Sequence, residues 1–265
     1  MNIYPNAYYN YKKNRKGEYK EKKEKIKEKI KIIYHENKGV PGYRQMRAYL
    51  KKQGVELSNI TIHKYMNKEL GLKSITRRKS GKYKKAKVHK VFENLLNQNF
   101  ESNEINKKWC VDFTYLYLED GRKRYNCTII DLYDRSVVAS KTDKYMTSNL
   151  AIKTIQQAIK AQPQIKGKLI LHSDQGSQYT SKEFVNFCEK TGITQSMSKI
   201  GCPYDNAPME RYFNTLKNEL IYQYSYKTEE ELYKAVEEFA YITYNHIRPH
   251  SYNGYKTPFE KRYAV

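Results

Sequence analysis

The pattern of apolar and polar residues divides the chain into two regions with different periods. Over Gly17–Tyr34 and from Tyr43 to about Glu69, apolar residues recur three and four positions apart, which predicts helices. Beyond residue 106, short runs rich in aromatic and β-branched residues predict strands, with helical patterns between the later ones. We expect a small all-helical region followed by an α/β domain, a mixed sheet with flanking helices.

The first predicted helix, Gly17–Tyr34, is rich in Lys and Glu and carries Ile26, Ile30 and Ile33 at helical spacing. We interpret it as an exposed amphipathic helix or as an arm that binds a partner. After it, Tyr43–Lys52 predicts a second helix.

Two residues set the limits of a third helix in this region. Ser58 can cap its start, and Gly71 can end it after about Glu69. Two short helices around a turn that contains Gly54 predict a helix-turn-helix. A helical hairpin that only packs on its neighbour would show the same pattern.

The second region begins with three strands that should form an antiparallel meander. The first contains Asp112, and Glu119-Asp120-Gly121 is a hairpin signal after it. The strands are expected at Trp109–Leu118, Lys123–Leu132 and Ser136–Lys141. After the meander, helices and strands alternate. We expect a helix from Ser148, a strand over Lys168–Leu171, a helix opened by a capping box at Thr180–Glu183, and a strand at Ile193–Met197. The helix that holds Glu210 follows, and further helices begin after Thr228 and Thr257.

Three carboxylates stand where catalytic chemistry is expected. Asp174 follows a short apolar strand, where open α/β sheets place their active sites. Asp112 lies in the middle of a strand, where a carboxylate is costly unless a cation meets it. Together with Glu210, these acids would repel one another without a counter-charge. They suit a pair of Mg²⁺ ions, which prefer oxygen ligands and can clamp an in-line phosphoryl displacement.

Glu210 should lie in the first turn of its helix. Asp205 and Asn206 are capping residues, and Pro208 is tolerated in a first turn. On this helix Glu210, Asn214 and Lys217 form a polar stripe beside an apolar face. A solvated helix face would give the same pattern, but the other two acids favour a site.

These residues carry a family resemblance. The order Asp112, Asp174, Glu210, with 35 residues between the last two, resembles the DDE signature of transposases and retroviral integrases on the ribonuclease H-like fold. The local words His172–Tyr179 and Tyr204–Ala207, with Lys217 seven residues after Glu210, are similar to the second reading frame (OrfB) of bacterial insertion sequences of family three. The resemblance covers the chain from about Gly42 onward.

The resemblance implies a DDE polynucleotidyl transferase. It would cut insertion-sequence ends and join them to other DNA, with two Mg²⁺ or Mn²⁺ ions held by the three acids and with Lys217 holding DNA. It also implies a homo-oligomer in a synaptic complex and, often, fusion to an upstream frame. Two alternatives stay open: a ribonuclease H-like nuclease that does not join, and a catalytically silent DNA-binding remnant.

Charge places the expected DNA contacts mainly in the first third. The formal net charge is +22, of which residues 1–90 carry +20, with 27 Lys and Arg against 7 Asp and Glu. Such a segment predicts salt-dependent binding of double-stranded DNA. The predicted DNA-binding residues are Arg44, Thr61, His63, Lys64, Lys68, Arg77, Arg78, Lys79, Lys199, Tyr204, Asn214 and Lys217.

Other features complete the prediction. His172 and Asn206 are expected to support the acids from behind. The four cysteines show no zinc spacing, no apolar run is long enough to span a membrane, and no signal peptide is seen, so we expect a cytoplasmic protein. The predicted domains are residues 1–38 (basic helical arm), 39–75 (helix-turn-helix-like region), 76–105 (basic linker) and 106–265 (catalytic core with carboxy-terminal helices).

Overall fold

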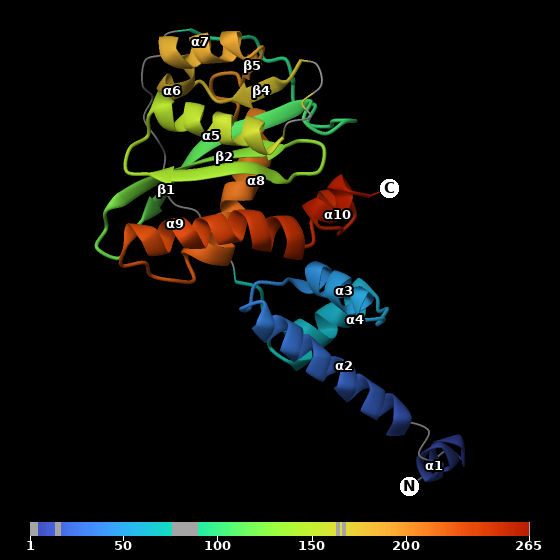
Figure 1. The fold of residues 1–265 in the computed structure, drawn as a ribbon. Helices are drawn as coiled ribbons and strands as arrows, with labels where there is room; N and C mark the ends of the chain where they lie inside the picture. The colour runs from blue at the N-terminus through green and yellow to red at the C-terminus, as the bar shows by residue number, and fades with distance from the viewer. Residues whose placement is uncertain (1–4, 14–16, 76–89, 163–164, 166–167, 265) are drawn as a thin grey trace. The chain divides into compact units, whose positions relative to one another are not determined.

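The fold comes from a computed structural model that describes residues 5–13, 17–75, 90–162, 165 and 168–264 (Figure 1). The chain divides into two compact units, Met1–Thr76 and Arg77–Val265. The first unit is helical in its described part. Its elements are α1 (Pro5–Lys12), α2 (Gly17–Glu36), α3 (Tyr43–Lys52), α4 (Asn59–His63) and η1 (Lys64–Glu69).

The core of the first unit joins α2 to the two helices that follow it. Ile30 and Ile33 of α2 are buried with side chains from α3, α4 and η1. The predicted amphipathic helix is therefore confirmed: most of its positions are exposed, while Ile30 and Ile33 bury apolar surface in the core of this unit. The complete set of buried core residues is Ile30, Ile33, Met46, Leu50, Ile62, Tyr65 and Met66.

The predicted start and end of the third helix are confirmed. The Ser58 hydroxyl oxygen accepts a hydrogen bond from the Thr61 backbone N–H at 3.1 Å, as an N-cap does. The helical stretch that begins there continues through η1, and Gly71 follows with φ +68°, a conformation that favours glycine.

The second unit is built on a five-stranded sheet in the order β3-β2-β1-β4-β5 (Figure 1). The first three strands pair antiparallel, as the hairpin signal predicted. β4 then pairs parallel with β1, and β5 pairs parallel with β4. Their bounds are β1 (Lys108–Tyr117), β2 (Lys123–Asp131), β3 (Val137–Asp143), β4 (Ile170–Ser173) and β5 (Thr194–Met197). The mixed sheet predicted from the sequence is confirmed.

Two hydrophobic clusters cover the sheet. In one, Trp109 and Val111 of β1 pack with residues of α5 and α7. In the other, Cys110 packs with α8 and η4, because neighbouring residues of a strand point to opposite faces. The helical elements are α5 (Ser148–Ala161), α6 (Ser177–Thr180), α7 (Lys182–Lys190), η2 (Pro203–Asn206), α8 (Ala207–Leu216), η3 (Lys217–Ile221), α9 (Glu229–Glu238), η4 (Phe239–Ile247), η5 (Ser251–Asn253) and α10 (Pro258–Arg262).

Local signals located most helix starts and misassigned two caps. The capping boxes at Thr228 and Thr257 are present. The box expected at Thr180 is not, since Ser181 caps α7 instead and Glu183 accepts a hydrogen bond from the Ser148 hydroxyl. Asn206 precedes α8 without a side-chain capping bond.

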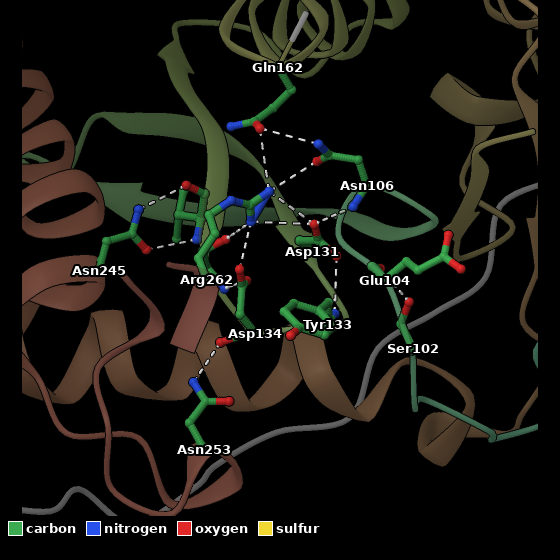
Figure 2. A network of polar contacts seen from close by, with 12 residues as sticks. Ser102, Glu104, Asn106, Asp131, Tyr133, Asp134, Gln162, Asn245, Asn253 and Arg262 are labelled. Carbon is green, nitrogen blue, oxygen red and sulfur yellow. Dashed lines mark hydrogen bonds and ion pairs between the residues drawn. The ribbon is translucent and has the colours of Figure 1, made fainter. Parts of the chain in front are cut away.

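A buried network of charged residues fixes the carboxy-terminal helix to the sheet (Figure 2). Arg262 of α10 donates to Asp134 at 2.7 Å and to Asp131 at 3.1 Å. The side chain of Arg262 is 6% exposed and those of the two aspartates are 0% exposed. Because two buried carboxylates surround one guanidinium, α10 forms part of the folded core rather than a loose tail.

Candidate active site

Asp112 lies in the middle of β1, opposite Thr128 of β2. Its parity along the strand is that of Cys110, so it points to the face that α8 covers. The side chain is half-buried. One carboxylate oxygen accepts a hydrogen bond from the Phe113 backbone N–H at 2.7 Å.

Asp174 follows β4 directly and lies next to Asp112. Cys110 of β1 is the partner of His172 in the parallel pairing with β4. The pairing of the two strands ends at Cys110 and His172, and Asp112 and Asp174 each follow this pair by two residues. The Asp174 carboxylate also accepts the backbone N–H of Gly176 at 2.9 Å, which holds it at the strand's exit.

The electrostatics show that these two acids share one environment. Burial raises the pKa of Asp112 well above its usual value, and the negative charge of Asp174 raises it further. The Phe113 N–H and the cation of Lys217 lower this pKa, while Glu210 raises it. Burial likewise raises the pKa of Asp174, against the Gly176 N–H. A cationic partner is therefore what this pair lacks.

Glu210 lies in the first turn of α8, as predicted, and its side chain is exposed. Lys217 begins η3 and is half-buried; burial lowers the pKa of its ammonium group and Asp112 raises it. Asn214 on the same helix is exposed. Among the described residues, no three His, Cys, Asp or Glu side chains are grouped closely enough to hold a metal ion. The structure thus brings Asp112 and Asp174 together and leaves Glu210 within range of their charge.

Asn206 connects the start of α8 to the acid pair. Its side-chain amide donates a hydrogen bond to the second oxygen of Asp112 at 3.1 Å. The sequence suggested Asn206 both as a cap and as a support for the acids, and the structure shows this contact in place of the cap.

His172 does not support Asp174 through its ring. Its Nδ1 is 2.8 Å from the Ser196 hydroxyl and its Nε2 is 2.9 Å from the Asp205 carbonyl. Because both nitrogens have these partners, His172 is a link between β4, β5 and the segment before α8. Burial lowers the pKa of His172, which favours the neutral ring.

Asp205 holds together the segments around this site through its hydrogen bonds. From the sequence it was predicted only as a residue that caps the helix carrying Glu210. Its carboxylate accepts three hydrogen bonds of 2.9 Å, from Asn94, Gln98 and the backbone N–H of Lys199. These bonds lower the pKa of Asp205, the Lys199 N–H most of all. No local pattern could reveal Asn94 and Gln98 as partners, since both lie more than 100 residues away.

Tyr179 is a second residue that sequence reasoning missed. It is fully buried, with its ring 5.7 Å from Phe113 and 5.3 Å from Phe184. Burial raises its pKa, and the charges of Cys127, Asp112 and Asp174 add to the effect. It belongs to the cluster that packs Trp109 and Val111 of β1 against α5 and α7.

The predicted DNA-binding residues have different degrees of exposure. Arg44, Lys64, Lys68, Lys199 and Tyr204 are exposed. Thr61 and His63 are half-buried, and the His63 ring lies edge-on to Tyr43 at 5.3 Å. Arg77, Arg78 and Lys79 lie outside the described residues.

The atoms around the acid pair fit a hard divalent cation. Besides the two carboxylates, the amide oxygen of Asn206, whose NH₂ group bonds Asp112, is buried and has no hydrogen-bond partner among the described residues. Carboxylate and amide oxygens are ligands that Mg²⁺ and Ca²⁺ accept. A divalent ion would also remove the conflict between like charges.

Comparison with known proteins agrees with this geometry. Two models described as integrase core domain match residues 102–203 and 191–258, and an HTH-like domain matches residues 21–80. The transposase for insertion sequence element IS904 of Lactococcus lactis is 35% identical over 243 residues, 90% of this chain and 94% of that protein. Transposase InsF for insertion sequence IS3A of Escherichia coli is 34% identical over 168 residues, 63% of this chain and 58% of that protein.

A solved structure of the simian T-cell lymphotropic virus intasome, in complex with a PP2A regulatory subunit, is similar in fold. The match has a TM-score of 0.51 and 18% identity, over 83% of this chain and 71% of that chain. The ribonuclease H-like fold expected from the sequence is confirmed.

An integrase core beside an HTH-like domain defines an enzyme class that rearranges DNA. The chain belongs to the transposases of insertion sequences, and its function is that of a DNA transposase. None of its described helices has the length and apolar character needed to span a membrane.

Proposed function

We propose that Asp112, Asp174 and Glu210 form the catalytic DDE triad of this transposase. The observation that carries the proposal is the position of Asp112 near Asp174, whose negative charge raises the pKa of the buried Asp112 carboxyl. Glu210 enters from α8, whose start is tied to Asp112 through Asn206. The negative charge of Glu210 also raises the pKa of Asp112, which supports its place in the triad.

The cofactor that fits these oxygens is Mg²⁺ or Mn²⁺, and two ions suit three acids that share a DNA phosphate. When bound, such ions supply activation of the nucleophile and stabilisation of the leaving oxygen. Asn206 orients the Asp112 carboxylate toward them. Lys217 is positioned to add a positive charge near the phosphate that reacts.

The reaction consists of two phosphoryl transfers. In strand cleavage, a water oxygen bonds to phosphorus, the bond from phosphorus to the 3′ oxygen breaks, and the proton that water gives up ends on the freed 3′ hydroxyl. In strand transfer, this 3′ hydroxyl attacks a phosphorus of other DNA, and the displaced 3′ oxygen takes up a proton. The second step conserves the number of phosphodiester bonds, so no external energy source is needed.

DNA binding is proposed for the basic residues of both units. Arg44, Thr61, His63, Lys64 and Lys68 would contact double-stranded DNA from the helix-turn-helix-like region, residues 39–75. Within the catalytic core, residues 106–265, Lys199, Tyr204, Asn214 and Lys217 would contact the strand ends. We further propose that the chain acts in the cytoplasm as a homo-oligomer that pairs two ends of the insertion sequence. In some cases it would act as a frameshift fusion to an upstream reading frame.

A strand-transfer assay with labelled insertion-sequence ends tests the proposed triad. We expect Asp112→Asn, Asp174→Asn and Glu210→Gln each to lower joining by about 100-fold or more, with DNA binding retained. Glu237→Gln, at an exposed position of α9, is the matched control and should join normally. Normal joining by any of the three variants would remove that acid from the triad. Cut products without joined ones from the unaltered chain would favour a nuclease, and binding alone would favour a silent remnant.

A further inference from the structure

Ile60 is an apolar side chain held in solvent at the start of a helix. It is the second residue of α4, after the Ser58 cap, and is 82% exposed. Ile62, two positions on, is fully buried in the core of the same unit. The helix therefore has a well-packed inner face, and Ile60 belongs to its outer face by position rather than through loose packing.

Exposed cationic residues lie on the helical stretch that carries Ile60 and on the helix before it. Lys64 and Lys68 follow Ile60 at four-residue intervals through η1, and both are exposed. Arg44 and Arg47 of α3 are also exposed. A single exposed isoleucine is common on protein surfaces and has no meaning alone. Here it lies at the amino-terminal turn of a cationic helix, and such turns contact base edges in helix-turn-helix proteins.

We propose that Ile60 recognises the C5 methyl group of a thymine in the major groove of the insertion-sequence end. This inference rests on the proposed binding of DNA by the helix-turn-helix-like region. The branched alkyl group of Ile60 forms no hydrogen bonds, and the thymine methyl is the apolar group that a base pair presents in the major groove. Lys64 and Lys68 would hold the phosphates on either side, which positions Ile60 without adding sequence preference.

Uracil tests the proposal directly, because it differs from thymine only by lacking this methyl group. The full chain is titrated by fluorescence anisotropy, at fixed salt, with a duplex of one insertion-sequence end in which each thymine in turn is replaced by uracil. We expect one or two positions to weaken binding by about fourfold, the value of one buried methyl group. Ile60→Ala should bind the thymine duplex more weakly and should show no difference between thymine and uracil there. Ile32→Ala, at a 49% exposed position of α2, is the matched control and should discriminate as the unaltered chain does.

Two further outcomes separate failure of this inference from failure of the proposed DNA contact. Suppose that Lys64→Ala and Lys68→Ala weaken binding. The proposed role of Ile60 is then wrong if Ile60→Ala still discriminates thymine from uracil, or if the unaltered chain discriminates at no position. If the two lysine variants bind as the unaltered chain does, this helix does not face DNA, and both proposals fail. Because Ile60 is exposed, its replacement by alanine should leave the helical circular dichroism spectrum unchanged.

Discussion

Asn206 donates a hydrogen bond of 3.1 Å to Asp112 across 94 positions of sequence. The bond joins the segment before α8 to the middle of β1. It therefore orients a proposed metal ligand and fixes where the helix that carries Glu210 begins. The remaining amide oxygen of Asn206 is buried and has no partner among the described residues, so it points to a further ligand.

We predict that Asn206→Ala lowers strand transfer by about 10- to 100-fold while the chain remains folded, the usual cost of losing a residue that orients a ligand. Asn206→Asp should be at least as harmful, because it adds a negative charge beside an acid that already lacks a counter-charge. Joining rates and the Mn²⁺ concentration for half-maximal rate would measure the effect. Asn186→Ala, at an exposed position of α7, serves for comparison of metal dependence and should leave the Mn²⁺ requirement unchanged. Equal Mn²⁺ requirements in all variants would contradict the orienting role.

Asp205 should be important for stability. Its buried carboxylate accepts three hydrogen bonds of 2.9 Å, so Asp205→Ala leaves the buried Asn94 amide without this partner and breaks two part-buried bonds. We expect the free energy of unfolding of the second unit to fall by about 2–4 kcal/mol, measured by urea denaturation. The control is Asp120→Ala in the exposed β1–β2 hairpin, where the loss should stay below about 1 kcal/mol. Similar losses for both variants would show that the Asp205 bonds contribute little.

Arg262 gives a test of the buried charge network in Figure 2. Arg262→Met removes the cation between Asp131 and Asp134 and leaves two buried carboxylates unpaired. The expected loss of stability is about 3–5 kcal/mol. Arg122→Met, which breaks an exposed ion pair with Asp120, should cost less than about 1 kcal/mol. If the two substitutions cost the same, the network is not what holds α10 in place.

We predict that His250 makes the free energy of unfolding fall in acid. Burial, together with the charges of Arg248, Arg135 and Arg211, lowers its pKa to about 3. A group whose pKa is lowered by folding contributes stability above its unfolded pKa, about 6.5, and loses it as the pH falls toward 3. The free energy of unfolding should therefore drop by about 2 kcal/mol between pH 7 and pH 5 from this group.

The matching measurement is urea denaturation at both pH values. His250→Gln should flatten this part of the pH dependence, and His246→Gln, at an exposed position, should not. An unchanged pH dependence in His250→Gln would assign the acid sensitivity to other groups.

The sequence predicted elements well because their signals are local. The aromatic and β-branched residues around Asp112 located β1, and the serine at position 58 located the start of α4. The position of Asp174 at a strand exit and of Glu210 in a first helical turn also followed from neighbouring residues. What the sequence could not predict depends on distant partners. Asp205 is suited to capping, yet its carboxylate binds donors from Asn94 and Gln98.

The first long helix gave a similar lesson. Its Lys and Glu content and its isoleucine spacing predicted an amphipathic helix, but not that Ile30 and Ile33 are buried against α3, α4 and η1. Charge composition describes the outer face of such a helix, while two or three isoleucines decide what it packs on. His172 was expected to support Asp174, yet both of its ring nitrogens have other partners, the Ser196 hydroxyl and the Asp205 carbonyl, which come from distant parts of the sequence.

The most direct test of the central proposal is a structure of the chain bound to an insertion-sequence end and Mn²⁺, with the manganese located by its anomalous scattering. We predict two manganese positions, with carboxylate oxygens of Asp112, Asp174 and Glu210 at about 2.0–2.3 Å and a DNA phosphate oxygen between the ions. Manganese bound elsewhere, with Asp112 and Asp174 making no contact to it while DNA occupies the site, would contradict the account.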